Sequence, residues 1–207
     1  MADKENNVKK DIKIILLGET GVGKTNLINV FFGLKFEDQI DSTLASYCNE
    51  GKFNYNNESY NYAIWDTAGQ EKFRAISKLF IRDAQIILIV YSIINRKTFE
   101  QVNFWLNLVK ENLENNTYIL GLVANKIDLY EHQIVMDEEG KKIAKENNID
   151  FLVTSALKSP ETFRKFVNKL LVKYIEKEGQ KIGNNDSIKI NGDIENKTNK
   201  KQCCKQS

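Results

Sequence analysis

The chain has 207 residues, of which 42% are apolar, and this suffices for one domain with a buried core but not for a second large domain. Its net charge of +2 provides no general attraction for a polyanion, so we expect no nucleic-acid partner. Three cysteines and one histidine argue against a disulfide framework and a multi-histidine metal site, which indicates a reducing compartment.

The first predicted element is a buried strand over residues 12–17, which precedes a glycine-rich loop and an amphipathic stretch from Asn26. The loop from Gly18 to Thr25 reads G-E-T-G-V-G-K-T, the pattern of a phosphate-binding loop between a strand and a helix. Its glycines let successive backbone N–H groups face a phosphate. We expect Lys24 to reach the phosphate oxygens and Thr25 to offer its hydroxyl to Mg²⁺. By itself, the loop does not distinguish a kinase, a motor and a switch.

Alternating aromatic residues next predict an antiparallel hairpin at the edge of a sheet, with strands near 53–55 and 60–64 joined by a polar Asn-Asn-Glu turn. The second strand leads to Asp66, at the strand end where ligands of α/β sheets bind, so its carboxylate can hold Mg²⁺ through water. Gly69 can bring its backbone N–H close to a terminal phosphate, and Gln70 can orient an attacking water.

Three further apolar runs, over 86–91, 118–124 and 151–153, predict parallel strands that are covered on both faces. Apolar residues at helical spacing predict helices over 99–113 and 163–174, the second preceded by a proline suited to a first turn.

The longest apolar run is far short of the ~20 residues that span a bilayer, and the first residues carry no secretion signal. We therefore expect the chain to stay on the cytosolic side.

Two polar motifs follow the later strands. Asn125-Lys126-Ile127-Asp128 comes after the strand over 118–124, and the Asp128 carboxylate can accept hydrogen bonds from the N1–H and N2 amino groups of guanine, a donor pair that adenine lacks. Thr154-Ser155-Ala156 ends the last strand, where backbone N–H groups can reach the O6 atom of guanine. Four motifs in this order, each at a strand end, favour a guanine-nucleotide site over a chance match.

These motifs, with W-D-T-A-G-Q-E-K-F-R around Asp66, resemble those of the small GTPases of the Ras superfamily over about residues 11–178. The tryptophan before Asp66 and the paired cysteines near the C-terminus are most similar to the Rab branch. The resemblance implies a three-layer α/β P-loop GTPase fold: a mostly parallel six-stranded sheet with one antiparallel edge strand and helices on both faces. We expect a short extension over 1–10, the GTPase domain over 11–178, and a flexible hypervariable tail over 179–207, where aromatic residues are lacking.

The resemblance also places Phe36 beside the guanine and assigns Thr43 to the loop that ligates Mg²⁺ in the GTP state. The nucleotide-binding residues matched in this way are Glu19, Thr20, Gly21, Val22, Gly23, Lys24, Thr25, Asn26, Phe36, Thr43, Gly69, Asn125, Lys126, Asp128, Ser155, Ala156 and Leu157. The implied Mg²⁺ ligands are Thr25, Thr43 and Asp66, and the implied catalytic residues are Lys24 and Gln70.

The chain departs from the Rab pattern at several positions. The segment after Thr43 reads Leu-Ala-Ser-Tyr-Cys where Rab proteins usually have Ile-Gly-Val-Asp-Phe, and Leu157 replaces the lysine of their Ser-Ala-Lys motif. Asp83 and Ser92 replace a usual glycine and a usual aspartate. Thr20 is bulkier than the glycine or serine common in relatives, so we expect slow intrinsic hydrolysis of GTP.

The resemblance implies a switch that binds Mg²⁺ with GTP or GDP and recruits effectors to membranes in vesicle traffic. The expected partners are a GTPase-activating protein, a guanine-nucleotide exchange factor, a GDP-dissociation inhibitor or escort protein, a prenyltransferase and effectors. Prenyl groups on Cys203 and Cys204 would hold the monomeric domain on the cytoplasmic face of intracellular membranes, with an inhibitor-bound pool in the cytosol. Alternatives are a scaffold that retains nucleotide without cycling, a Ras-like signalling GTPase farnesylated at Cys204, and a P-loop kinase that uses ATP.

Overall fold

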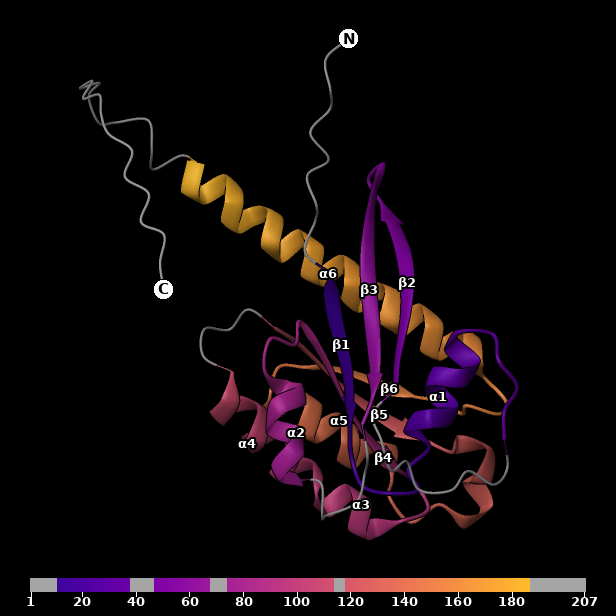
Figure 1. The fold of residues 1–207 in the computed structure, drawn as a ribbon. Coiled ribbons are helices and arrows are strands. Elements are labelled where there is room, and N and C mark those ends of the chain that lie inside the picture. Colours follow the sequence, from indigo (N-terminus) through magenta and orange to yellow (C-terminus); the bar gives the residue numbers. More distant parts are fainter. Residues whose placement is uncertain (1–10, 38–46, 68–73, 114–117, 187–207) are drawn as a thin grey trace, which may run out of the picture.

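The computed structural model describes residues 11–37, 47–67, 74–113 and 118–186. Within these residues the strands form one six-stranded sheet in the order β2-β3-β1-β4-β5-β6 (Figure 1). The strands are β1 (Ile12–Leu17), β2 (Tyr47–Tyr55), β3 (Glu58–Asp66), β4 (Ile86–Ser92), β5 (Ile119–Asn125) and β6 (Asp150–Val153). All neighbouring strands are parallel except β2 and β3, so the predicted sheet with one antiparallel edge strand is confirmed.

Helices cover both faces of this sheet. They are α1 (Lys24–Phe31), α2 (Arg74–Ile81), α3 (Arg96–Glu100), α4 (Val102–Asn112), the 3₁₀ segment η2 (Ile127–His132), α5 (Asp137–Glu146) and α6 (Pro160–Asp186). On one face, Leu16 shares a core with Leu27 of α1 and Phe163 of α6. On the other face, the adjacent Leu17 shares a second core with Trp105 of α4. Successive side chains of a strand point to opposite faces, so β1, which is apolar except for Lys13, supplies both cores of a three-layer fold.

The strands β2 and β3 form the predicted hairpin. Tyr55 pairs with Glu58, which leaves the two-residue turn Asn56–Asn57 between the strands. Both asparagines have a positive φ, 50° and 62°, as a two-residue type I′ turn requires, and asparagine tolerates this conformation better than most residues. Glu58 therefore belongs to β3, whereas the sequence pattern places it in the turn.

The helices follow the sequence prediction less closely than the strands do. The single helix predicted over 99–113 is divided into α3 and α4 at Gln101. Asn95 caps α3, because its side chain accepts a hydrogen bond from the Lys97 N–H. The sequence patterns do not predict α2, η2 or α5. In α5 most residues are charged and only Gly140 and Ala144 are buried, so it lacks a wide apolar stripe.

Helix α6 is longer than the sequence predicts. It begins at Pro160, as expected of a proline in a first helical turn, and runs to Asp186, so the predicted domain boundary at residue 178 falls inside it. A glycine costs a helix only about 1 kcal/mol, and Gly179 is followed by residues that continue it. The Tyr55 hydroxyl donates to Glu176 at 2.6 Å, and α6 and the β2–β3 hairpin extend from the same end of the molecule (Figure 1). The residues from 187 onward lie outside the described part.

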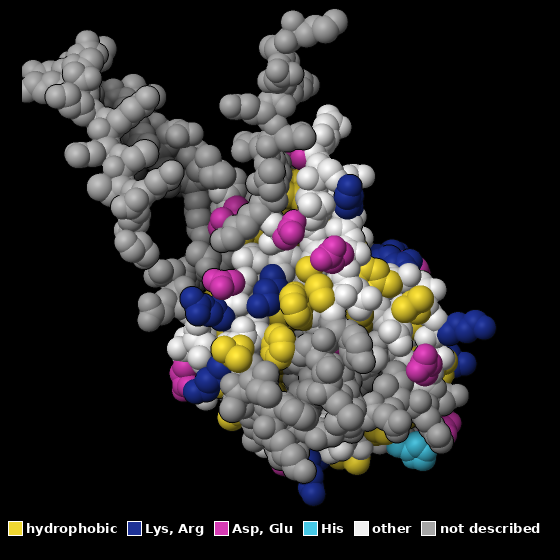
Figure 2. All heavy atoms as spheres, viewed as in Figure 1, with side chains coloured by type: hydrophobic (Ala, Val, Ile, Leu, Met, Phe, Trp, Pro, Cys, Tyr) yellow, Lys and Arg dark blue, Asp and Glu magenta, His cyan; other side chains and the backbone are white. Residues whose placement is uncertain are grey.

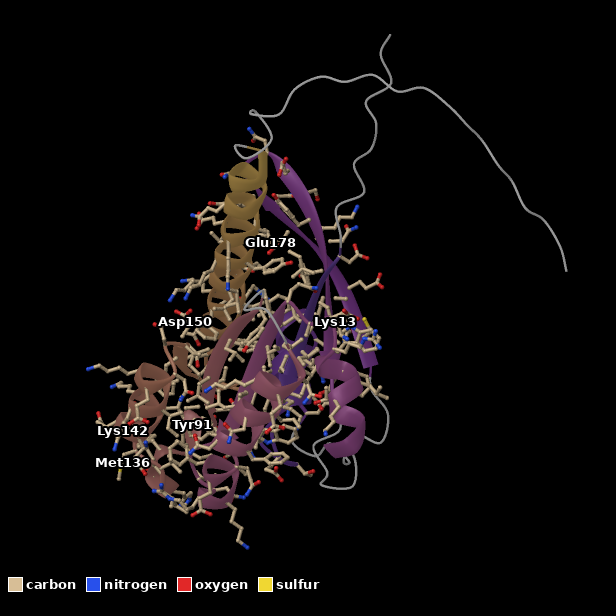
Figure 3. All side chains as sticks on the ribbon, turned by 90° about the vertical axis from the view of Figure 1, so that its left-hand side faces the viewer. Lys13, Tyr91, Met136, Lys142, Asp150 and Glu178 are labelled. Carbon is tan, nitrogen blue, oxygen red and sulfur yellow. The ribbon has the colours of Figure 1, made fainter. Side chains whose placement is uncertain are left out.

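Charged side chains of both signs are interspersed over the face drawn in Figure 2. Asp150, at the start of the edge strand β6, accepts hydrogen bonds from Lys169 and Lys173 of α6 at 2.6 and 2.7 Å, and it lies beside that helix (Figure 3). These lysines hold the pKa of Asp150 below its usual value even though burial opposes that shift. Among the described helices, none is long and apolar enough to cross a membrane.

Substitution of glycine by alanine is expected to have opposite effects at two helical positions. A Cβ atom on Gly140 in α5 would lie 2.4 Å from the Tyr91 hydroxyl and 2.6 Å from the Phe151 ring, whereas a Cβ on Gly179 in α6 has no such neighbour within 4 Å. Tyr91 points from β4 toward α5 (Figure 3). We expect Gly140→Ala to lower the free energy of unfolding by about 1–3 kcal/mol through overpacking, and Gly179→Ala to raise it by roughly 0.5–1 kcal/mol through helix propensity.

Urea unfolding of both variants beside the unmodified protein measures these changes. Equal stabilisation by the two alanines would show that α5 does not pack against Tyr91 and Phe151 as described.

Candidate functional site

The phosphate-binding loop lies between the end of β1 and the start of α1, as the sequence predicts. Two of its glycines are needed because other strands approach it closely. A Cβ atom on Gly18 would lie 2.2 Å from the Val90 carbonyl oxygen of β4, and one on Gly23 would lie 2.5 Å from the Asn125 side-chain nitrogen of β5. Both glycines also have a positive φ, 143° and 94°. The loop is therefore shaped by the carboxyl ends of the two neighbouring strands as well as by its own sequence.

Lys24 is a buried cation at the first position of α1. Its side-chain nitrogen donates to the carbonyl oxygens of Gly18 and Glu19 at 2.8 and 3.0 Å, and the residue is only 6% exposed. Burial lowers the pKa of Lys24 to about 8, although Asp66 and Glu19 act in the opposite direction. A buried ammonium group beside the N-terminus of a helix is a suitable environment for an anion such as phosphate.

Thr25 and Asp66 meet at 2.7 Å, where the threonine hydroxyl donates to the carboxylate at the end of β3. Asp66 is 2% exposed, and the next residue, Thr67, donates its hydroxyl to the Leu16 carbonyl oxygen at 2.5 Å. The two neighbouring oxygens are hard donors of the kind that Mg²⁺ prefers. Within the described residues no group of three or more His, Cys, Asp or Glu surrounds a metal position. This donor set suits Mg²⁺, which keeps several waters and is completed by substrate phosphates.

Asn125 connects the phosphate-binding loop to the loop after β6. Its side-chain nitrogen donates to the Val22 carbonyl oxygen at 2.8 Å, and its side-chain oxygen accepts from the Ala156 N–H at 3.3 Å. The residue is 1% exposed, and its own carbonyl oxygen accepts from the Ile93 N–H. One buried amide thereby fixes segments that are far apart in the sequence.

Asp128 lies in η2 and is oriented by Ser155. The Ser155 hydroxyl donates to Asp128 at 2.5 Å and also accepts from the N–H groups of Leu157 and Lys158 at 3.1 and 2.9 Å. The sequence assigns Ser155 a backbone role only, so this side-chain role is an addition. Lys126 adopts the left-handed conformation between the two motif residues, with a φ of 72°, and burial lowers its pKa.

The segment after α1 returns to the phosphate-binding loop. The Asn26 side chain bonds to both backbone groups of Glu37, and Phe36 is half-buried against the core shared by α1 and α6.

Sequence patterns do not reveal Arg164 of α6, which donates to the last carbonyl oxygens of α1 at 3.0–3.3 Å. In the loop, Thr20 is exposed and Glu19 is half-buried, and Leu157 is 45% exposed near Ser155.

Five of the predicted site residues lie outside the described residues. They are Thr43, Gly69, Gln70, Cys203 and Cys204. Of the others, the residues of the phosphate-binding loop, Asp66, Asn125, Lys126, Asp128 and residues 155–157 lie at the carboxyl edge of the sheet, at or just after the ends of β1, β3, β5 and β6. Asn26 lies in α1, and Phe36 lies in the segment that follows this helix. A groove of about 410 Å³, lined by Asp11, Lys52 and Asn61 among others, lies at the amino end of β1 and is not part of this site.

The chain is similar in sequence to known proteins. The family model described as the Ras family matches residues 13–176. The chain is similar to the Ras-related protein RABA2b of Arabidopsis thaliana, at 33% identity over 93% of each chain. It is also similar to the GTP-binding protein ypt3 of Schizosaccharomyces pombe, at 39% identity over 70% of this chain and 67% of that one. The Ras-related protein Rab-18 of Caenorhabditis elegans is 34% identical over 83% of this chain and 85% of its own.

The contact between Gly23 and Asn125 yields a testable coupling. Gly23→Ala would drive a Cβ atom into the Asn125 amide as well as strain the backbone, so we expect it to lower the free energy of unfolding by about 2–4 kcal/mol. In an Asn125→Ala background the clash is gone and only the backbone strain remains, so the added cost should fall to about 1 kcal/mol. Urea unfolding of the two single variants and the double variant, all without nucleotide, measures the difference. Additive effects would contradict the contact.

Proposed function

The chain belongs to the Ras family, as a GTP hydrolase of the Rab type, and we propose that it is a molecular switch that cycles between GTP and GDP and recruits effectors to membranes in vesicle traffic. The observation that carries this proposal is the meeting of four motifs at one edge of the sheet. The four motifs lie at the carboxyl ends of β1, β3, β5 and β6. Hydrogen bonds connect them: Thr25 bonds to Asp66, Asn125 bonds to Val22 and Ala156, and Ser155 bonds to Asp128.

The phosphate end of the site supplies charge and orientation. Lys24 and the backbone N–H groups of the loop would hold the phosphates and stabilise negative charge that develops on the transferred group. Thr25 and Asp66 would hold Mg²⁺, which when bound neutralises charge on the phosphate oxygens. Thr43 is proposed as a further ligand, and Gln70 would orient the attacking water. Loss of contacts at Thr43 and Gly69 after hydrolysis would then release the effector-binding surface.

The base end of the site provides specificity. Ser155 bonds to one oxygen of the Asp128 carboxylate and so fixes its orientation. A carboxylate held in this way can accept from the N1–H and N2 amino groups of guanine, while adenine would leave it without those donors. Asn125 accepts from the Ala156 N–H and so holds the loop that we propose to face the O6 atom of guanine. We therefore propose GTP and GDP rather than ATP as the ligands.

Hydrolysis is proposed to depend on a GTPase-activating partner. The guanidinium of Arg96 is engaged by Glu139, and that of Arg164 by the carbonyl oxygens of α1, away from the phosphate-binding loop. An arginine supplied by a partner typically accelerates hydrolysis by roughly 10³–10⁵. An exchange factor, effectors, a prenyltransferase and a GDP-dissociation inhibitor or escort protein complete the proposed set of partners.

The proposed membrane attachment uses the C-terminal segment. Prenyl groups on both Cys203 and Cys204 would give the two apolar signals that stable anchoring needs. Lysines near them, such as Lys200 and Lys201, would add attraction to anionic headgroups of about 1 kcal/mol each. The protein would then work on the cytoplasmic face of intracellular membranes and exchange with an inhibitor-bound pool in the cytosol.

Thr20 gives the first test of this function. Thr20 is exposed in the phosphate-binding loop, and we propose that its bulk disturbs the geometry of the terminal phosphate and the attacking water. We expect Thr20→Gly to hydrolyse bound GTP about tenfold faster than the unmodified protein in single-turnover assays with γ-labelled GTP. A Gln70→Leu variant provides the slow control, and ATP in the same assay should be neither bound tightly nor hydrolysed.

The results separate the alternatives. Binding of GTP with no turnover in any variant would favour a scaffold that retains nucleotide, and a preference for ATP would favour a kinase. Equal rates for Thr20→Gly and the unmodified protein would show that the threonine does not limit hydrolysis.

The paired cysteines give a second test. We expect the full-length protein to lie on one set of intracellular membranes and a Cys203→Ser/Cys204→Ser variant to be dispersed in the cytosol, since the variant has lost both anchors. Imaging beside organelle markers measures this and names the compartment. Each single serine variant shows whether one prenyl group is enough, and membrane binding by the double variant would contradict the proposed anchoring.

A further inference from the structure

We propose that Asn26 is a positioning residue that holds the backbone of Glu37 against the first turn of α1, and so controls how long a guanine nucleotide stays bound. This inference rests on the proposed function, because it concerns retention of GDP in the same site. It assigns a role to the Asn26 side chain, whereas the motif resemblance places only the residue itself near the nucleotide.

The contact is a matched pair of hydrogen bonds. The Asn26 side-chain nitrogen donates to the Glu37 carbonyl oxygen at 2.8 Å, and its side-chain oxygen accepts from the Glu37 N–H at 3.0 Å. Asn26 is only 9% exposed, whereas Glu37 is exposed, so loss of the Asn26 side chain would remove both bonds and leave the Glu37 backbone held by water alone. An amide is suited to this task because it carries a donor and an acceptor side by side.

The chain reverses sharply between the two residues. At the end of α1 the Gly33 N–H bonds to the Val30 carbonyl oxygen and the Leu34 N–H bonds to that of Asn29, the two bonds of a Schellman motif. Gly33 has the positive φ of 78° that this motif needs. The motif sends the chain back along the helix, and four residues later Glu37 has reached the level of Asn26.

The far end of α1 is fixed independently. Arg164 of α6 donates to the carbonyl oxygens of Val30 and Phe31, and Glu161 accepts from its guanidinium at 2.6 Å. Helix α1 is therefore held at its C-terminus, and the returning segment is held at the N-terminus by Asn26. The bonds between Asn26 and Glu37 therefore hold the returning segment beside the first turn of α1, next to the phosphate-binding loop.

The position of this bond gives it influence over the nucleotide. Glu37 directly follows Phe36, the aromatic residue that we propose to lie beside the guanine, and it precedes the segment that leads to Thr43. Asn26 directly follows Thr25, which bonds to Asp66. Asn26 thus connects the turn that carries the proposed metal ligand Thr25 to the segment that carries Phe36. Loss of the Asn26 side chain should free Phe36 and speed dissociation of the nucleotide without removing any phosphate contact.

The dissociation rate of fluorescent GDP tests this proposal. We expect Asn26→Ala to release GDP about tenfold faster than the unmodified protein, the equivalent of the two hydrogen bonds. Asn29→Ala is the matched control, since it makes the same change one turn later on α1, where no described contact of the side chain reaches Glu37, and its rate should be unchanged.

Two further measurements distinguish positioning from general destabilisation. If Asn26 acts through Phe36, then in a Phe36→Leu background the added effect of Asn26→Ala should shrink to about twofold or less, since coupled residues are not additive. Hydrogen exchange of the nucleotide-free protein should show faster exchange at the Glu37 amide in Asn26→Ala and unchanged exchange in the strands.

The outcomes separate the inference from the function on which it rests. Failure of the unmodified protein to bind GDP would overturn both. Tight binding with equal dissociation rates for Asn26→Ala and Asn29→Ala would overturn the inference alone, as would full additivity with Phe36→Leu or unchanged exchange at Glu37.

Discussion

The buried amide of Asn125 is the interaction on which the rest of the site depends. It bonds to Val22 in the phosphate-binding loop and to Ala156 in the loop after β6, and it leaves room only for a glycine at position 23. Loops that follow different strands have no covalent reason to keep a fixed separation. A site that holds both the base and the phosphates of one nucleotide needs such a connection, and a buried amide that both donates and accepts provides it.

The same edge of the sheet carries the polar residues that a buried core normally excludes. Lys24, Asp66 and Asn125 are each at most 6% exposed, and each has partners that offset the cost of burial. The lysine is held by carbonyl oxygens, which compensate an ammonium group less fully than an anion does, and burial lowers its pKa to about 8. The arrangement thus suits the phosphate that we propose as its ligand, because an anion would relieve the cost that Lys24 now bears.

The sequence predicts the strands and motif residues well because both depend on local patterns. A strand buried on both faces, such as β4 or β5, is apolar except at its last residue, and a phosphate-binding loop needs its glycines in a fixed order. Helix α5 and the full length of α6 escape prediction, because a charged helix on a sheet edge and an exposed glycine in a helix carry weak signals. The contacts of Ser155 with Asp128 and of Arg164 with α1 join residues distant in sequence, so only the folded chain reveals them.

The first turn of α1 connects the two ends of the proposed nucleotide site mechanically. Adjacent helical residues point about 100° apart, so Thr25 and Asn26 face different elements although one peptide bond joins them. Thr25 bonds to Asp66 on β3, and Asn26 bonds to Glu37 on the returning segment. Because a helical turn is stiff, a shift of Thr25 toward a metal ion cannot leave Asn26 in place. In the proposed site, a change at the phosphates therefore has a short covalent route to the segment that we propose to cover the base.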